Sequence, residues 1–279
     1  MTVSFEQIGG DQPASPVIVS VPHAGRDYPA ELIEALRVPV AALRSLEDRR
    51  IDEVAVAAGG EELLLVQRRA RTWIDLNRAE QERDPSVDAG ARPVERPSSK
   101  VRSGLGLVPA RVAGAGALWR HRFSGRAIER RIADDHRPYH ARLSALLAAA
   151  RARFGVGVLL DLHSMPPLGA GRPQVVIGDR FGTSAGGRYV ARMEGVIAAA
   201  GWRAALNAPY AGGYVIATHG RPAAGIHAVQ LELDRSLYLD AMFDEIGEGF
   251  DHTVAAVRAV IDALSEEALG AGAMAAAAE

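Results

Sequence analysis

The chain contains no cysteine among its 279 residues. This absence excludes disulfides, thiolate nucleophiles and metal sites built from cysteine, so any bound metal must take histidine and carboxylate ligands. The sequence also lacks an apolar run approaching the ~18 residues of a membrane span. Its N-terminus has no basic segment followed by an apolar one, as a secretory signal would. These absences predict a cytoplasmic protein with no membrane-spanning segment.

Neither sign of charge dominates, because the formal net charge is only -2. Nothing therefore favours nucleic acid or a membrane surface as a partner. A chain of this length can bury a sizeable core, and we expect a single domain over residues 1–265. The Ala/Gly-rich residues 266–279 are expected to be a disordered tail. The oligomeric state does not follow from the sequence.

Short β-branched or apolar runs alternate with segments of helical periodicity. This alternation predicts an α/β fold whose central mixed, largely parallel sheet is covered on both faces. Residues 80–117 show little periodicity and are expected to form a long irregular loop. Strands are predicted at 16–21, 62–66, 72–76, 155–160, 174–177 and 226–233, helices at 30–37, 40–58, 128–150, 184–200 and 239–264, and a turn entering a strand at 207–218.

Two histidines, His23 and His163, each follow a predicted strand. Ligand sites in open α/β sheets lie outside the carboxyl ends of strands, so one fold can bring these side chains together. A single histidine at such a position more often caps a loop, but a pair with an acid favours zinc. A catalytic zinc has three protein ligands and keeps one position open for water. Glu47 or Asp48 would supply the acid, although acids on an amphipathic helix are usually solvated.

Glu232 lies in the middle of an apolar strand, where an ionised carboxylate is costly unless it is paired or near a metal. Its best role is that of a general base that takes a proton from water and passes it to the leaving amine. Alternatively, the period of two along the strand turns this side chain outward. Asn77 and Arg78 follow the predicted strand 72–76, and an arginine there would bind a carboxylate. Arg71 would stabilise the oxyanion of a tetrahedral intermediate, although each arginine taken alone is more simply a surface residue.

The order of these motifs along the chain resembles the N-formylglutamate amidohydrolase family. The resemblance rests on Val21–Gly25, Leu46–Asp48 followed by Ile51 and Asp52, Asp75–Arg78, Asp161–Ser164, and His227 with Gln230–Leu233. Further matching pieces are Arg137–His140, Val176–Gly182, Gly212–Tyr214 and Thr218–Pro222. The family is similar to the zinc-dependent exopeptidases and to the aspartoacylase and succinylglutamate desuccinylase group. That kinship implies a three-layer α/β/α fold and one zinc per chain.

The resemblance also implies roles for individual residues. It makes His23, His163 and Asp48 the zinc ligands, with Glu47 as the alternative acid, and it makes Glu232 the base. Arg71 would polarise the carbonyl, while Asn77 and Arg78 would contact a substrate carboxylate. His219 and His227 are candidates for substrate binding or remain loop histidines, and Asp161 would orient an imidazole. One departure is Arg26, which stands where the exopeptidases place their acidic ligand.

The resemblance therefore implies a zinc amidohydrolase that converts N-formyl-L-glutamate and water to formate and L-glutamate, the last step of one histidine degradation route. The nearest rival is a deacylase or a carboxypeptidase-like hydrolase of another N-acyl amino acid or peptide. A rival of another class is a non-catalytic binding protein that keeps the fold.

Overall fold

The computed structural model describes residues 4–112 and 114–276. The chain divides into two compact units, which are described separately. Unit 1 comprises the N-terminal residues up to Glu6, Pro22–Asp48 and Gln67–Ala141, and unit 2 comprises Gln7–Val21, Arg49–Val66 and the chain from Arg142 onward. Among the described residues, no helix combines the length and the apolarity needed to cross a membrane.

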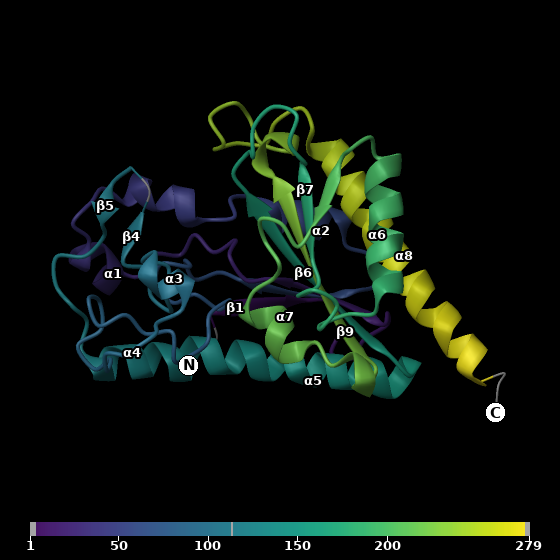
Figure 1. The fold of residues 1–279 in the computed structure, drawn as a ribbon, viewed down its shortest axis with the longest axis horizontal. Coiled ribbons are helices and arrows are strands. Elements are labelled where there is room, and N and C mark those ends of the chain that lie inside the picture. The colour runs from purple at the N-terminus through teal and green to yellow at the C-terminus, as the bar shows by residue number, and fades with distance from the viewer. Residues whose placement is uncertain (1–3, 113, 277–279) are drawn as a thin grey trace. The chain divides into compact units, whose positions relative to one another are not determined.

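Unit 2 is built on a mixed sheet (Figure 1). Within the described residues the sheet has seven strands in the order β1-β3-β2-β6-β9-β7-β8. Strands β3, β2, β6 and β9 run parallel, β7 is antiparallel to β9, and β8 is parallel to β7. The predicted mixed, largely parallel sheet is confirmed. The strands are β1 (Phe5–Ile8), β2 (Val17–Val21), β3 (Leu63–Gln67), β6 (Gly157–Met165), β7 (Val175–Gly178), β8 (Ala204–Leu206) and β9 (Ile226–Asp234).

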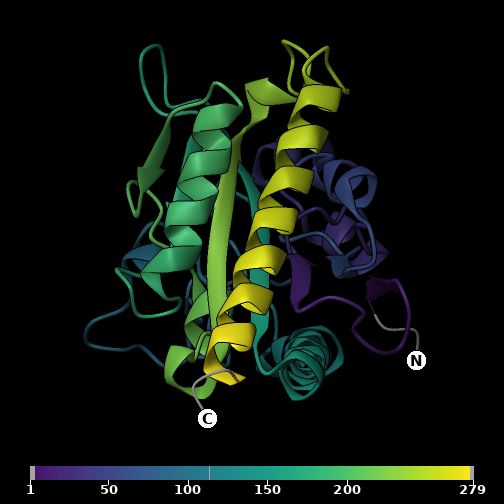
Figure 2. The ribbon, with the colours of Figure 1, turned by 90° about the vertical axis from the view of Figure 1, so that its right-hand side faces the viewer.

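Helices cover both faces of this sheet. Helices α2 (Ile51–Ala58), α6 (Gly187–Ala199) and α8 (Phe250–Ala276) pack together and against the strands, and Figure 2 shows α6 and α8 side by side. Helix α7 (Tyr214–His219) contacts β6 and β9 and lies on the opposite side of them in Figure 1. Every residue of β2, β3 and β6 is buried, as expected for central strands covered on both faces. The fold is therefore the predicted three-layer α/β/α.

Unit 1 is mainly irregular. Among residues 80–112 and 114–117, the regular elements are only the four-residue helix α3 and the two-residue strands β4 and β5. The core of this unit holds Arg131, which is 1% exposed and lies between the rings of Trp73 and Phe123, 3.7 and 4.0 Å from their centroids. Its elements are α1 (Ala30–Ala35), η1 (Val40–Leu46), α3 (Ser99–Arg102), β4 (Arg111–Val112), β5 (Gly116–Ala117), α4 (Gly125–Arg131), the π-helix η2 (Ile132–His136) and the start of α5 (Arg137–Phe154).

Several predicted elements are wrong. Residues 72–76 form turns and irregular backbone instead of a strand. Residues 214–218, which belong to the segment predicted as a turn entering a strand, lie in α7. The single helix predicted over 40–58 is two helices, because Glu47 is extended and Arg50 is left-handed with φ 57°. The last helix begins at Phe250 instead of Leu239, and it continues to Ala276 through residues expected to be disordered.

Candidate functional site

His23 lies two residues after β2 and is fixed by two aspartates. Its Nε2 is 2.8 Å from Oδ1 of Asp75, and its Nδ1 is 3.6 Å from Oδ2 of Asp48. The backbone N–H of Asp48 donates to the carbonyl of His23 over 3.0 Å, which holds the two segments together. All three side chains are buried. Both ring nitrogens of His23 therefore face carboxylates in an environment almost without water.

Asp75 connects this histidine to two arginines. Its Oδ2 lies 2.8 Å from Nε of Arg71 and 3.8 Å from Nε of Arg78, and its Oδ1 accepts the backbone N–H of Asn77 over 2.8 Å. Burial alone would raise the pKa of Asp75, but Arg71, Arg78 and His23 outweigh it and hold that pKa well below its usual range. We did not predict this residue from the sequence. The sequence could have indicated it, because Asp75 is the first residue of the Asp75–Arg78 motif, in which Asn77 and Arg78 were predicted to bind substrate.

His163 lies within β6 and is fixed in a similar way. Its Nε2 is 2.9 Å from Oδ2 of Asp161, two residues earlier on the same face of the strand. Oδ1 of Asp161 accepts the hydroxyl of Ser20 over 2.9 Å, and Ser20 is the register partner of Asp161 on β2. Asp161 is fully buried. The contact is of the kind expected for an aspartate that orients an imidazole, although its role stays a prediction.

Glu232 is the register partner of His163 across the parallel pair β6 and β9. Side chains at paired positions of neighbouring strands share a face of the sheet, so this carboxylate stands beside the imidazole. Glu232 is only 8% exposed, and its Oε1 accepts Nε2–H of Gln230 over 2.8 Å. The alternative that this side chain turns outward to solvent does not hold.

The structure brings His23, Asp48 and His163 into one buried group. Each offers one ligand atom, and these atoms lie within 4.8 Å of one another. Ligand atoms ~2.0–2.1 Å from a tetrahedral zinc lie about 3.3 Å apart, close to the separation of His23 Nδ1 from Asp48 Oδ2. Two imidazoles and a carboxylate form a donor set that suits zinc, and each imidazole has an aspartate on its Nε2. The group therefore fits a metal ion.

Glu47, the alternative acid, is not part of that group. Its carboxylate accepts a hydrogen bond from the hydroxyl of Tyr28, and it is 3% exposed. A buried carboxylate already satisfied by a phenol has less reason to carry a metal. The geometry thus favours Asp48 as the acid beside the two histidines.

The three residues predicted to bind substrate or polarise a carbonyl lie together in unit 1. Arg78 is 5% exposed, and its guanidinium donates to the carbonyls of Leu105 and Asn77 over 2.8 and 2.6 Å. Burial lowers the pKa of Arg78, while the charge of Asp75 partly restores it. Nε of Arg71 contacts Oδ2 of Asp75, and 17% of the Arg71 side chain is exposed. Arg71 is thus the more accessible of the two guanidinium groups.

The two remaining predicted histidines lie in different places. His219 ends α7 and is 6% exposed, and burial lowers its pKa to about 4 against the opposing charge of Asp161. His227 lies five residues before Glu232 on β9, which is about 16 Å along a strand. Its Nδ1 accepts the N–H of Gly186 over 3.1 Å, and its ring lies 4.5 Å from that of Tyr189. These contacts are those of a packing residue, in contrast to the substrate-binding role suggested by the sequence.

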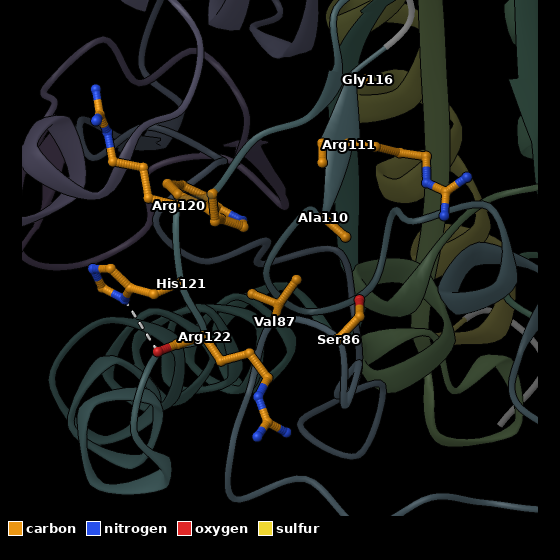
Figure 3. Close-up of a pocket in the computed structure, with 10 residues that line it drawn as sticks. Ser86, Val87, Ala110, Arg111, Gly116, Arg120, His121 and Arg122 are labelled. Carbon is orange, nitrogen blue, oxygen red and sulfur yellow. Dashed lines mark hydrogen bonds between the residues drawn. The ribbon is translucent and has the colours of Figure 1, made fainter.

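A hollow of about 460 Å³ in unit 1 contains none of the predicted site residues (Figure 3). It is lined in part by Arg111, Arg120 and Arg122, whose guanidinium groups point in different directions in Figure 3. Arg120 and Arg122 donate to the backbone carbonyls of Leu36 and Pro85. Because these positive groups do not converge, the hollow is not built as an anion site.

Comparison with known proteins places the chain among related sequences and structures. The family model for N-formylglutamate amidohydrolase matches residues 15–239. The N-formylglutamate deformylase of Pseudomonas aeruginosa is 31% identical over 264 residues, covering 89% of this chain and 92% of that protein. The deformylase of Pseudomonas putida is 32% identical over 238 residues, covering 81% of this chain and 82% of that protein.

Comparison with solved structures supports the same family. The N-formylglutamate amidohydrolase from Ralstonia eutropha JMP134 superposes with a TM-score of 0.86 at 31% identity, covering 96% of this chain and 99% of that one. An Agrobacterium tumefaciens protein has a TM-score of 0.69 at 18% identity, covering 97% of this chain and 96% of that one, and shows a common fold. The resemblance found in the motifs is confirmed. The chain belongs to the N-formylglutamate amidohydrolase family and is an amide hydrolase.

Proposed function

We propose that the protein is a zinc-dependent N-formylglutamate deformylase, which hydrolyses N-formyl-L-glutamate to formate and L-glutamate. The observation that carries the proposal is the buried Glu232 in register with His163, a member of the His23, Asp48 and His163 group. The names of the Pseudomonas relatives support the substrate.

His23, Asp48 and His163 would hold the zinc. When bound, zinc supplies a Lewis acid that polarises the scissile carbonyl and acidifies water. The protein residues supply the rest. Asp75 and Asp161 orient the two imidazoles through Nε2, so that both rings present a defined edge.

Glu232 would act as the general base. The hydrogen bond from Gln230 fixes its carboxylate, and burial strengthens its interaction with a nearby proton. It takes one proton from the attacking water and delivers it to the nitrogen of the leaving amine. A C–O bond forms at the formyl carbon and the C–N bond breaks, so the products are formate and the free amino acid.

Arg71 would stabilise the negative charge that develops on the carbonyl oxygen, because Asp75 fixes its guanidinium while part of the side chain stays exposed. Asn77 and Arg78 would receive a substrate carboxylate. An arginine is suited to that task because its donors match a carboxylate pairwise.

The test replaces Glu232 by Gln and follows formate release. Loss of a general base lowers kcat about 10²–10⁴-fold, while the zinc content stays at one per chain. Glu62→Gln is the matched control, since Glu62 is a buried glutamate of unit 2 that pairs with Arg258 instead. Near wild-type turnover by Glu232→Gln would refute the role of this residue.

Substrate and metal are tested separately. Rates with the formyl, acetyl and succinyl derivatives of glutamate and aspartate decide the acyl group, and we expect N-formylglutamate to give the highest kcat/KM. Removing the metal with a chelator should abolish turnover, and zinc should restore it. Less than about half a zinc per chain, not raised by added zinc, would instead favour a binding protein.

A further inference from the structure

Two histidines outside the proposed mechanism hold the backbone that carries Asn77 and Arg78. His136 Nε2 lies 2.8 Å from the carbonyl oxygen of Arg78, and His140 Nε2 lies 2.9 Å from that of Leu76. A carbonyl only accepts, so both ring nitrogens must donate. The two contacts flank Asn77 on either side. This short stretch is therefore held at both ends by imidazole N–H groups.

The two rings reach neighbouring carbonyls because of where they lie on the helix. His136 ends the π-helix η2, and His140 is four residues later in the first turns of α5. Residues four apart share a face of a helix, and the two rings lie 4.5 Å apart. The π-helix is a rare conformation that is frequent at functional sites. His136 is 1% exposed, which makes its hydrogen bond a buried one.

Side chains also bind both backbone groups of Asn77. The carbonyl of Asn77 accepts from Nη1 of Arg78, and the N–H of Asn77 donates to Asp75. The N–H of Arg78 donates to the backbone carbonyl of Asp75 over 3.2 Å. The three carbonyls of residues 76–78 and the N–H of Asn77 bond to side chains, where a strand would use another strand. The conformation of Asn77 and Arg78 depends on these side chains.

We propose that His136 and His140 are positioning residues that fix the Leu76–Arg78 backbone and so aim Asn77 and Arg78 at a carboxylate of the substrate. The inference rests on the proposed function for the identity of the substrate. The carbonyl contacts of the two histidines do not depend on it.

The test compares His140→Leu, which removes the donor, with His140→Gln, whose side-chain N–H group can reach the same carbonyl. His252→Leu is the matched control, because His252 also contacts a backbone carbonyl, that of Ala200, but in unit 2. We expect His140→Leu to raise KM for N-formylglutamate about tenfold with kcat within about threefold. His140→Gln should recover most of the loss, and His252→Leu should leave KM unchanged.

Hydrogen–deuterium exchange gives a readout that needs no substrate. Peptides covering residues 72–82 should exchange about tenfold faster in His140→Leu than in wild type, and at nearly the wild-type rate in His140→Gln. Unchanged exchange and KM in His140→Leu, or an equal loss in His140→Gln, would overturn the proposal. A fall in kcat without a change in KM would do the same. If wild type hydrolysed no N-acyl amino acid, the proposed function would fail, and the exchange data alone would still decide whether the histidines hold this backbone.

Discussion

Asp75 offers a strong test of the site, because one carboxylate contacts His23, Arg71 and Arg78. Replacement by Asn keeps the shape of the side chain and removes its charge. An amide presents one oxygen and one NH₂ group, so it cannot accept from the imidazole and from a guanidinium as the carboxylate does. We expect two separate losses, one in metal affinity and one in stability.

The size of each loss follows from the contacts. Removing the partner that orients a metal-binding histidine typically weakens metal affinity 10–100-fold, which corresponds to about 1.4–2.8 kcal/mol. Asp75 is fully buried, and breaking a buried ion pair by removing one partner costs about 3–5 kcal/mol of stability. Asp75→Asn should therefore be less stable and should bind zinc more weakly.

Zinc affinity is measured by competition with a chromogenic chelator, and stability by urea unfolding of the metal-free protein. Asp88→Asn is the matched control, because Asp88 is a buried aspartate of unit 1 that pairs with Arg83 instead of a histidine. The control should lose stability and keep the wild-type zinc affinity. Equal zinc affinity in Asp75→Asn and Asp88→Asn would refute the reasoning.

Three further predictions follow from single residues. The folded pKa of His227, about 4, lies below its unfolded value of about 6.5, so its contribution to stability is complete above pH 6.5 and is lost as the pH falls toward 4. Between pH 7.5 and 5, urea unfolding should show wild type losing about 2 kcal/mol more than His227→Asn, and parallel profiles would contradict this. Asp48→Ala should lose zinc by elemental analysis while Glu47→Gln keeps one per chain; the reverse result would make Glu47 the ligand. Gly25→Ala would place a Cβ 2.1 Å from the carbonyl oxygen of Arg69, and thermal melting should show a loss of at least about 1–3 kcal/mol, whereas an unchanged melting temperature would mean that this loop adjusts freely.

The sequence allowed prediction of the parts of the site that follow from strand periodicity. His23 and His163 stand at or just beyond strands whose apolar runs are continuous, and parallel neighbours necessarily bring such positions to one edge. Glu232, which the structure places in register with His163, was predicted because a carboxylate in an apolar strand is costly. These inferences needed only local patterns and the general rules of α/β sheets.

The rest depended on contacts between distant segments. Residues 72–76 have the composition of a strand, but they pair with no strand. Trp73 instead bonds to Asp135 of η2, and the carbonyl of Leu76 bonds to His140 of α5. Asp75 was missed for the same reason, since its importance lies in His23, 52 residues away. The strand β8 has three residues, two of them alanine, and gave no pattern to detect. In residues 72–76, tertiary partners override the local propensity for a strand.

The pairing of His163 with Glu232 on β6 and β9 limits which insertions and deletions the sequence can accept. A single inserted or deleted residue in either strand would turn one of the two side chains to the opposite face of the sheet. We therefore expect insertions and deletions in these two strands to be selected against in evolution and to inactivate engineered variants. This alternation of side chains between two faces does not constrain the largely irregular segment 80–117. A library of variants selected for new acyl substrates should therefore vary that segment and leave β6 and β9 unchanged.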